Sequence, residues 1–231
     1  MSLLFLCLLN FAGIANAGMQ ISEAIIFFEP DKPPRHDVTI FNPDNENLYV
    51  KADLFEVKNP GLASEERISV TNPDEISLMI TPNKLVVPPN SQKTIRFVNV
   101  QPPGEIERVF RATITPVVGE QTAKQSGIKL MIAYGILIFV QPENPKTDLI
   151  VTRTGTKFHV KNMGNTNTVL TKGKQCVSLQ DGKLNNEKSD CHELKSKRLY
   201  PGEEWIQDLP LNAPVEYTLK TGSKYSKAIY P

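Results

Sequence analysis

The sequence predicts an all-β protein that consists of two β-sandwich domains. Short stretches along the chain alternate apolar and polar residues at the period of a strand, and helical periodicity is almost absent. The 18 prolines outnumber the 13 glycines, which favours many short strands and turns over long helices. A length of 231 residues exceeds one minimal domain and fits two domains of sandwich size.

The composition is that of a folded protein with almost no net charge. Hydrophobic residues make up 40% and charged residues 22%, and 26 basic against 25 acidic side chains give a net charge of +1, which argues against a nucleic-acid partner. Residues 1–144 hold 12 basic and 16 acidic side chains, a net −4, whereas residues 145–231 hold 14 and 9, a net +5. The basic half fits an acidic partner, an anionic membrane or a solvated face with scattered lysines.

The N-terminus carries an apolar stretch that ends in Ala15-Asn16-Ala17, before the first charged residue, Glu23. An apolar segment that ends in Ala-x-Ala is typical of a secretory signal, so we expect residues 1–17 to be a signal peptide and the chain to be exported. The stretch is too short for a membrane span. The alternative is a buried apolar strand.

Cleavage of such a signal removes Cys7 and leaves Cys176 and Cys191. Two cysteines in an exported chain usually form a disulfide, and closing a loop of this size stabilises a fold by about 3 kcal/mol. A metal site is the alternative, but His192 is the one further ligand nearby, and we expect no metal.

Eight candidate strands with turn residues between them precede a stiff linker at residues 141–145. They are Ile21–Phe28, Val38–Phe41, Tyr49–Val57, Ile76–Ile80, Lys84–Val87, Thr94–Val100, Val109–Pro116 and Ile128–Val140. This spacing describes one antiparallel sandwich, assigned to residues 18–144. Seven shorter candidates follow and predict a smaller β domain over residues 145–231, which contains the cysteine pair: Leu149–Thr152, Lys157–Lys161, Asn167–Val177, Lys197–Tyr200, Glu204–Gln207, Val215–Leu219 and Ser226–Tyr230.

No constellation for catalysis is visible in the sequence. It contains three histidines, and it lacks a Gly-x-Ser-x-Gly elbow, a phosphate-binding glycine loop and a His-Glu-x-x-His motif. The paired acids Glu65-Glu66 and Asp74-Glu75 lie in turn-like stretches and are interpreted as solvated loop charges. We therefore expect neither an enzyme nor a bound cofactor.

Residues 128–140 form an unusually long apolar run. Large side chains occupy every even position of this run, and a strand of this length would extend roughly 40 Å at about 3.4 Å per residue. Such a strand exceeds the usual length of about 5–6 residues and can project beyond its own sheet. The pattern fits either a core strand or an exposed edge that docks a partner.

Several stretches, in this order, resemble periplasmic pilus chaperones. Residues 76–97, with Thr81-Pro82 and Arg96, are similar to one characteristic stretch of that family, residues 107–111 to the next, and residues 128–142 to the long last strand of the first domain. The turn at residues 162–165, the two cysteines and the Tyr200-Pro201-Gly202 turn resemble the alternate, colonization-factor type of chaperone–usher systems.

The resemblance implies two immunoglobulin-like domains in a boomerang, or L-shaped, arrangement. It also implies a periplasmic chaperone that binds, folds and caps pilus or fimbrial subunits by donor-strand complementation and delivers them to an outer-membrane usher, without a cofactor. The donor residues would be Ile128, Leu130 and Ile132 with Tyr134, and each large side chain buried would stabilise the complex by about 1.5–3 kcal/mol. A register slip of one residue would replace them by Lys129, Met131 and Ala133.

The resemblance leaves the anchor for the subunit's terminal carboxylate open. In the better-known branch of the family an arginine and a lysine bind it, and their positions align near Ile25 and Leu137, neither of which is basic. Possible substitutes are Arg35, Lys129 and Arg111, each of which can equally be a surface charge. The resemblance also implies an ion pair between Arg96 and Glu107 that fixes the angle between the domains.

Two other classes of exported protein fit less well. A two-domain surface or fimbrial subunit, such as an adhesin, would carry its apolar donor segment at the N-terminus, whereas here the long apolar run lies in mid-chain. A carbohydrate-active or carbohydrate-binding protein usually needs a cluster of aromatic side chains, but this chain has one tryptophan, Trp205, and 7% aromatic residues.

Overall fold

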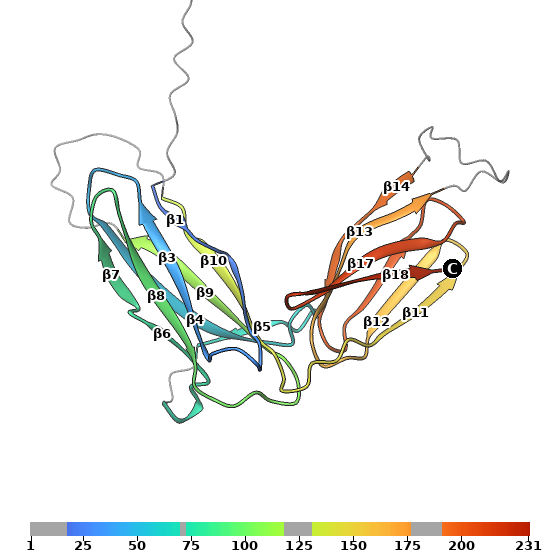
Figure 1. Cartoon of the computed structure of the whole chain (residues 1–231), viewed down its shortest axis with the longest axis horizontal. Coiled ribbons are helices and arrows are strands. Elements are labelled where there is room, and N and C mark those ends of the chain that lie inside the picture. Colours follow the sequence, from blue (N-terminus) through green and yellow to red (C-terminus); the bar gives the residue numbers. More distant parts are fainter. Residues whose placement is uncertain (1–17, 70–72, 118–130, 177–190) are drawn as a thin grey trace, which may run out of the picture.

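The computed structural model describes residues 18–69, 73–117, 131–176 and 191–231. Two β-sandwiches form the arms of an L, which confirms the predicted all-β fold class (Figure 1). Within these residues, the single helical element is the short 3-10 turn η1 (Pro73–Glu75).

The first sandwich consists of two sheets. One has the order β1 (Gln20–Ile21), β3 (Arg35–Asn42), β8 (Ser91–Asn99) and β6 (Leu78–Thr81). The other has the order β2 (Ile25–Phe28), β10 (Tyr134–Val140), β9 (Arg108–Val117), β4 (Leu48–Lys58) and β5 (Glu66–Ile68), and β7 (Lys84–Val87) also pairs with β4. Alternate apolar residues of both sheets meet in the core, where Ile95, Ile114 and Ile138 are fully buried.

The second sandwich is smaller. One sheet has the order β11 (Leu149–Thr154), β12 (Lys157–Asn162) and β16 (Glu204–Asp208). The other has the order β14 (Cys191–Leu194), β13 (Thr168–Cys176), β17 (Val215–Thr221) and β18 (Lys224–Tyr230), and β15 (Lys197–Leu199) pairs with β13. Phe158, Leu170 and Tyr217 are fully buried between the sheets. The predicted disulfide is confirmed: Cys176 and Cys191 are joined between β13 and β14.

The predicted strand Ile21–Phe28 is two strands in the structure. Gln20–Ile21 pairs antiparallel with β3 in one sheet, and Ile25–Phe28 pairs parallel with β10 in the other. The chain therefore crosses from sheet to sheet at Ser22–Ala24, and only its downstream half lies beside β10. Two further strands, β5 and β14, were not predicted, because their largely polar, exposed residues show no apolar alternation.

Candidate functional site

The edge of β10 is open over its first three residues. All of β10 pairs with β9, from Tyr134 opposite Ile114 to Val140, whereas β2 covers the other edge only from Leu137 onward. Tyr134–Ile136 thus have no strand on that side among the described residues. An unpaired strand edge presents backbone N–H and C=O groups that can accept a strand from another protein.

β10 is shorter than the strand predicted over residues 128–140, and Pro116 of β9 explains where it begins. The N–H of Leu137 donates to the carbonyl of Ala24, at 2.9 Å, so the even-numbered residues of β10 direct their N–H and C=O groups to β9. In continued register, Ile132 would lie opposite Pro116, which has no N–H to donate. The ladder therefore stops at Tyr134.

The predicted donor residues differ in their surroundings. Ile132 is 51% exposed, as expected for a residue available to a partner. Tyr134 instead packs against the core of its own domain, and its hydroxyl donates to the Met19 carbonyl at 2.8 Å. Ile128, Leu130 and the candidate anchor Lys129 lie outside the described residues.

The outer face of the β2–β10–β9–β4 sheet points toward the second domain. We call its two rows nearest that domain the interdomain face. In the upper row Ile25, Leu137, Arg111 and Phe55 lie side by side across the four strands. The lower row lies nearer the second domain and is formed in the same way by Phe27, Phe139, Val109 and Val57, three of which are buried.

Arg111 is the basic residue next to the position where the family's lysine was expected. It pairs with Leu137 on one side and Phe55 on the other. Its Nε is buried and has no hydrogen-bond partner among the described residues. Burial raises the pKa of the Tyr200 phenol, and the positive charges of Arg198 and Arg111 oppose that shift. Arg35, the other described candidate, lines a groove beside β2 together with Ile25 and other residues.

The predicted ion pair between Arg96 and Glu107 is wrong. Arg96 lies on the exposed face of β8 and donates two hydrogen bonds to Asp37 of β3, at 2.6 and 2.7 Å. Asp37 faces Arg96 directly across the ladder, whereas Glu107 precedes β9 in the other sheet. Cross-strand register therefore decides the partner of Arg96.

Glu107 nevertheless lies at the junction of the domains, as the resemblance implied for the pair. Its carboxylate is buried and accepts hydrogen bonds from the Thr166 hydroxyl at 2.7 Å, the Asn167 N–H at 3.0 Å and the Asn167 side-chain amide at 2.7 Å. Burial raises the pKa of Glu107, and these donors and nearby Arg198 oppose that shift. Asn165 adds hydrogen bonds to the carbonyls of Glu105 and Asn144.

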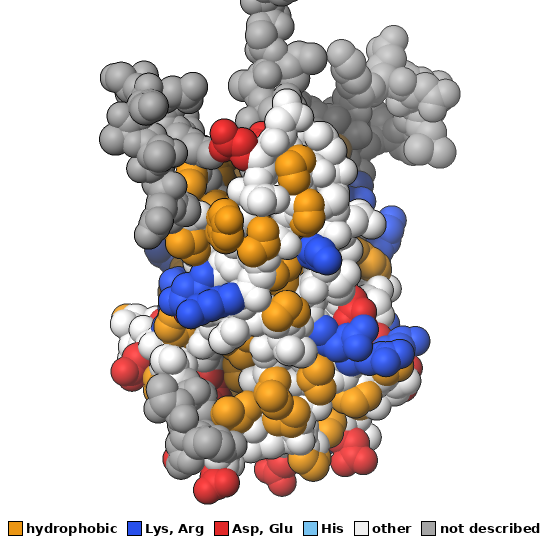
Figure 2. All heavy atoms as spheres, turned by 90° about the vertical axis from the view of Figure 1, so that its left-hand side faces the viewer, with side chains coloured by type: hydrophobic (Ala, Val, Ile, Leu, Met, Phe, Trp, Pro, Cys, Tyr) orange, Lys and Arg blue, Asp and Glu red, His pale blue; other side chains and the backbone are white. Residues whose placement is uncertain are grey.

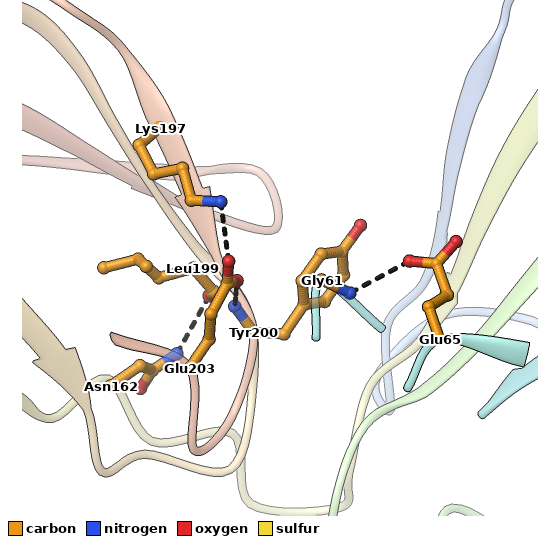
Figure 3. A network of polar contacts seen from close by, with 7 residues as sticks. All are labelled: Gly61, Glu65, Asn162, Lys197, Leu199, Tyr200 and Glu203. Atoms are coloured by element: carbon orange, nitrogen blue, oxygen red, sulfur yellow. Dashed lines mark hydrogen bonds and ion pairs between the residues drawn. The ribbon is translucent and has the colours of Figure 1, made fainter. Parts of the chain in front are cut away.

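A second contact between the domains joins the loop after β4 to the turn before β16. In this turn Glu203 accepts hydrogen bonds from the N–H of Tyr200 at 3.0 Å and from Lys197 at 2.6 Å (Figure 3). The Tyr200 ring is directed at Gly61, whose backbone is so close that an added Cβ would lie 2.7 Å from the ring. Gly61 has φ +78°, a conformation suited to glycine.

Cations of the second domain cover the aromatic rings of the interdomain face. The Arg198 guanidinium lies 4.6 Å from the centre of the Phe139 ring and also donates to the side-chain oxygen of Asn167. The Lys220 ammonium lies 5.9 Å from the centre of the Phe27 ring. The sequence did not identify these residues, because Arg198 and Lys220 stand out only through their spatial neighbours.

Exposed hydrophobic side chains occur on other surfaces as well. Figure 2, which looks at the side of the first domain away from the second, shows them scattered between lysine, arginine and acidic groups. Scattered exposed apolar groups are ordinary on proteins, so exposure alone does not locate a site. Within the described ranges, no group of three potential metal ligands and no helix able to span a membrane is present.

Comparisons with known proteins agree with this geometry. A family model described as "Pili and flagellar-assembly chaperone, PapD N-terminal domain" matches residues 18–146. A curated CFA/I fimbrial protein of Escherichia coli is 26% identical over 135 residues, which are 55% of this chain and 56% of that protein. The chain thus aligns with about half the length of this curated relative.

Solved structures resemble the chain over nearly its whole length. The class 5 fimbriae chaperone CfaA has a TM-score of 0.66 at 19% identity, with 92% of this chain and 99% of that chain covered. A chain in the complex of the Salmonella enterica SafA pilin with the SafB chaperone has a TM-score of 0.59 at 15% identity, with 92% and 95% covered. These likenesses establish the fold of two immunoglobulin-like domains. Because the family model matches more than half of the 231 residues, the chain belongs to the pili and flagellar-assembly chaperones.

Proposed function

We propose that the protein captures pilus or fimbrial subunits by lending them a strand at the open edge of β10. The observation that carries this proposal is that Tyr134–Ile136 pair with β9 alone, directly after the exposed Ile132. A subunit strand that pairs with this edge gains backbone hydrogen bonds worth about 1 kcal/mol each. The solved complex of SafB with the SafA pilin is a precedent for a chaperone of this fold bound to a pilin.

Side-chain burial supplies the rest of the affinity. Ile132 has the same parity as Ile136 and Ile138, which face the core, so it points into the sandwich that an added subunit would continue. Ile128 and Leu130, predicted from the sequence, share this parity. Burying each would contribute about 1.5–3 kcal/mol.

Arg111 anchors the terminal carboxylate of the subunit in this proposal. It stands on the outer face, in the row of Leu137 and Ile25, and its partnerless Nε leaves a donor for an anion, as far as the described residues go. An arginine can bind a carboxylate with two parallel hydrogen bonds. Arg35 is less suitable because it belongs to the other sheet of the sandwich.

Subunit capture takes place in the periplasm and ends at an outer-membrane usher. The disulfide between Cys176 and Cys191 fits an oxidising compartment, and residues 1–17, which lie outside the described residues, are the export signal in this proposal. In this scheme residues 18–144 capture the subunit and residues 145–231 form the second domain.

Two adjacent substitutions test the proposal. Ile132→Asp places a charge where the subunit core would bury it, whereas Met131→Asp changes a neighbour that is 41% exposed and has the opposite parity. Each variant is co-expressed in the periplasm with the fimbrial subunit of the same strain, and the complex is quantified after purification. We expect Ile132→Asp to abolish the complex and Met131→Asp to leave it. Equal yields from wild type and Ile132→Asp would refute the proposal.

A further inference from the structure

The sheet of the first domain has a vacant place directly above β2, as far as the described residues go. The first residue pair between β2 and β10 is Ile25 opposite Leu137, and upstream of Ser22 the chain pairs with β3 in the other sheet. A strand added to the open edge of β10 therefore lies in line with β2. Its outward side chains continue the line that Phe27 and Ile25 form along β2.

Phe27, at the lower end of this line, contacts the second domain. The Phe27 ring lies 5.9 Å from the Lys220 ammonium, and the same ammonium lies 5.4 Å from the centre of the Tyr225 ring. Phe27, Lys220 and Tyr225 thus form a continuous contact from β2 to β18. β18 is therefore linked to β2 through Lys220 of β17, next to the place where an added strand would begin.

The outer face of β18 carries large, solvent-exposed side chains. Tyr225 is 64% and Ile229 68% exposed, at alternate positions of an edge strand that pairs only with β17 in the described part of the chain. Lys227 lies between them on the same face. The opposite face of the hairpin is the core side, which contains Val215 and Tyr217.

Positive charge surrounds these two apolar side chains. Lys220 stands opposite Tyr225, Lys227 opposite Thr218, and Ile229 opposite Glu216. Glu216 is shared by two lysines, with its Oε1 3.6 Å from Lys174 and 3.8 Å from Lys227. The face therefore keeps a net positive charge and suits a surface that combines apolar and acidic side chains.

We propose that the outer face of β18, formed by Tyr225, Lys227 and Ile229, is a second contact for the subunit that β10 holds. The subunit lies in the angle between the domains and presents apolar residues beside acidic ones to this face. The inference rests on the proposed function. It adds a role in recognition for the second domain, which would otherwise only support the first.

Site-specific crosslinking tests the contact directly. Tyr225 is replaced by the photo-reactive residue p-benzoylphenylalanine, and so, in a separate variant, is Ile206, which is 62% exposed on the other sheet of the same domain. Both variants are purified in complex with the fimbrial subunit of the same strain and irradiated. We expect a chaperone–subunit crosslink from position 225 and none from position 206. A complex that crosslinks from neither position, or equally from both, overturns the inference.

Dissociation rates give an independent measure. The double substitution Tyr225→Ser with Ile229→Ser is expected to speed subunit dissociation about tenfold, as loss of apolar contacts does at other interfaces, with Ile206→Ser at the wild-type rate. A wild-type rate in the double variant refutes the inference and leaves the role of β10 intact. Failure of the wild type itself to bind the subunit refutes the proposed function instead.

Discussion

Leu137 lies directly opposite Ile25 in the parallel pair of β10 and β2, with Arg111 on the other side of Leu137. These are the positions where the resemblance to pilus chaperones implied a lysine and an arginine. The basic residue of this row is Arg111, one strand further into the sheet, on β9. The structure thus keeps a positive charge in the same row while its edge is apolar.

Arg111→Ala is expected to weaken subunit binding about a hundredfold, because the subunit's carboxylate would lose its hydrogen-bonded partner, a loss of roughly 2–3 kcal/mol. Arg111→Lys should retain part of the affinity, since a lysine keeps the charge but not the planar pair of donors. The dissociation constant of the purified complex measures both effects. Arg35→Ala serves as the control, and a larger loss from Arg35→Ala than from Arg111→Ala would reassign the anchor.

Pro116→Val is expected to lengthen β10 toward Ile132. A valine supplies the N–H that proline lacks and allows one more hydrogen-bonded pair with the segment before Tyr134. Hydrogen exchange at the Ile132 amide should slow in the free variant relative to wild type. An unchanged exchange rate would show that something other than Pro116 ends the ladder.

The raised pKa of Glu107 predicts that the contribution of this carboxyl to the free energy of unfolding depends on pH and falls as the pH rises. Burial raises its pKa in the folded protein above the ordinary value of 4.5, so between these two values the folded state holds more protons than the unfolded state. This carboxyl therefore makes the free energy of unfolding fall as the pH rises through that window.

Urea unfolding of wild type and Glu107→Gln across this window isolates the contribution of Glu107. The difference in the free energy of unfolding between the two proteins should change with pH, because glutamine does not titrate. Carboxyls whose pKa is lowered, such as Asp37, cancel in this difference. A difference that stays constant with pH would contradict the assignment.

Gly61→Ala is expected to disturb the contact between the domains. The added Cβ would lie 2.6 Å from Glu203 Oε2 and 2.7 Å from the Tyr200 ring, and φ +78° strains any other residue by about 1 kcal/mol or more. Gly155→Ala is the matched control, because Gly155 has φ +60° but no atom within 4 Å of the new Cβ among the described residues. Small-angle scattering should show a changed domain angle for Gly61→Ala only.

Replacing Cys176 and Cys191 by serine should destabilise the second domain by about 3 kcal/mol, since the disulfide restricts the unfolded chain. Subunit capture at β10 should persist, because β13 and β14 belong to the other domain. Thermal unfolding and co-purification with the subunit measure the two effects separately. Loss of capture at a temperature where the second domain remains folded would contradict the division of roles.

The sequence by itself determined the all-β class, the two sandwiches and the pairing of the cysteines. Apolar alternation at strand period and the turn residues between strands are local signals, and two cysteines left after the signal allow one pairing. The apolar run at residues 128–140 also marked β10, the strand whose edge is open in the structure.

Only the tertiary structure decided which side chains meet across the sheets and between the domains. Arg96 binds Asp37 rather than Glu107 because strand register sets its neighbour, and β10 begins at Tyr134, where Pro116 would be the next partner in the ladder but has no N–H. Tyr134 packs against the core of its own domain, and Lys220 of the second domain contacts the Phe27 ring of the first. Such contacts depend on residues far apart in the chain, whose approach follows from packing rather than from any local pattern.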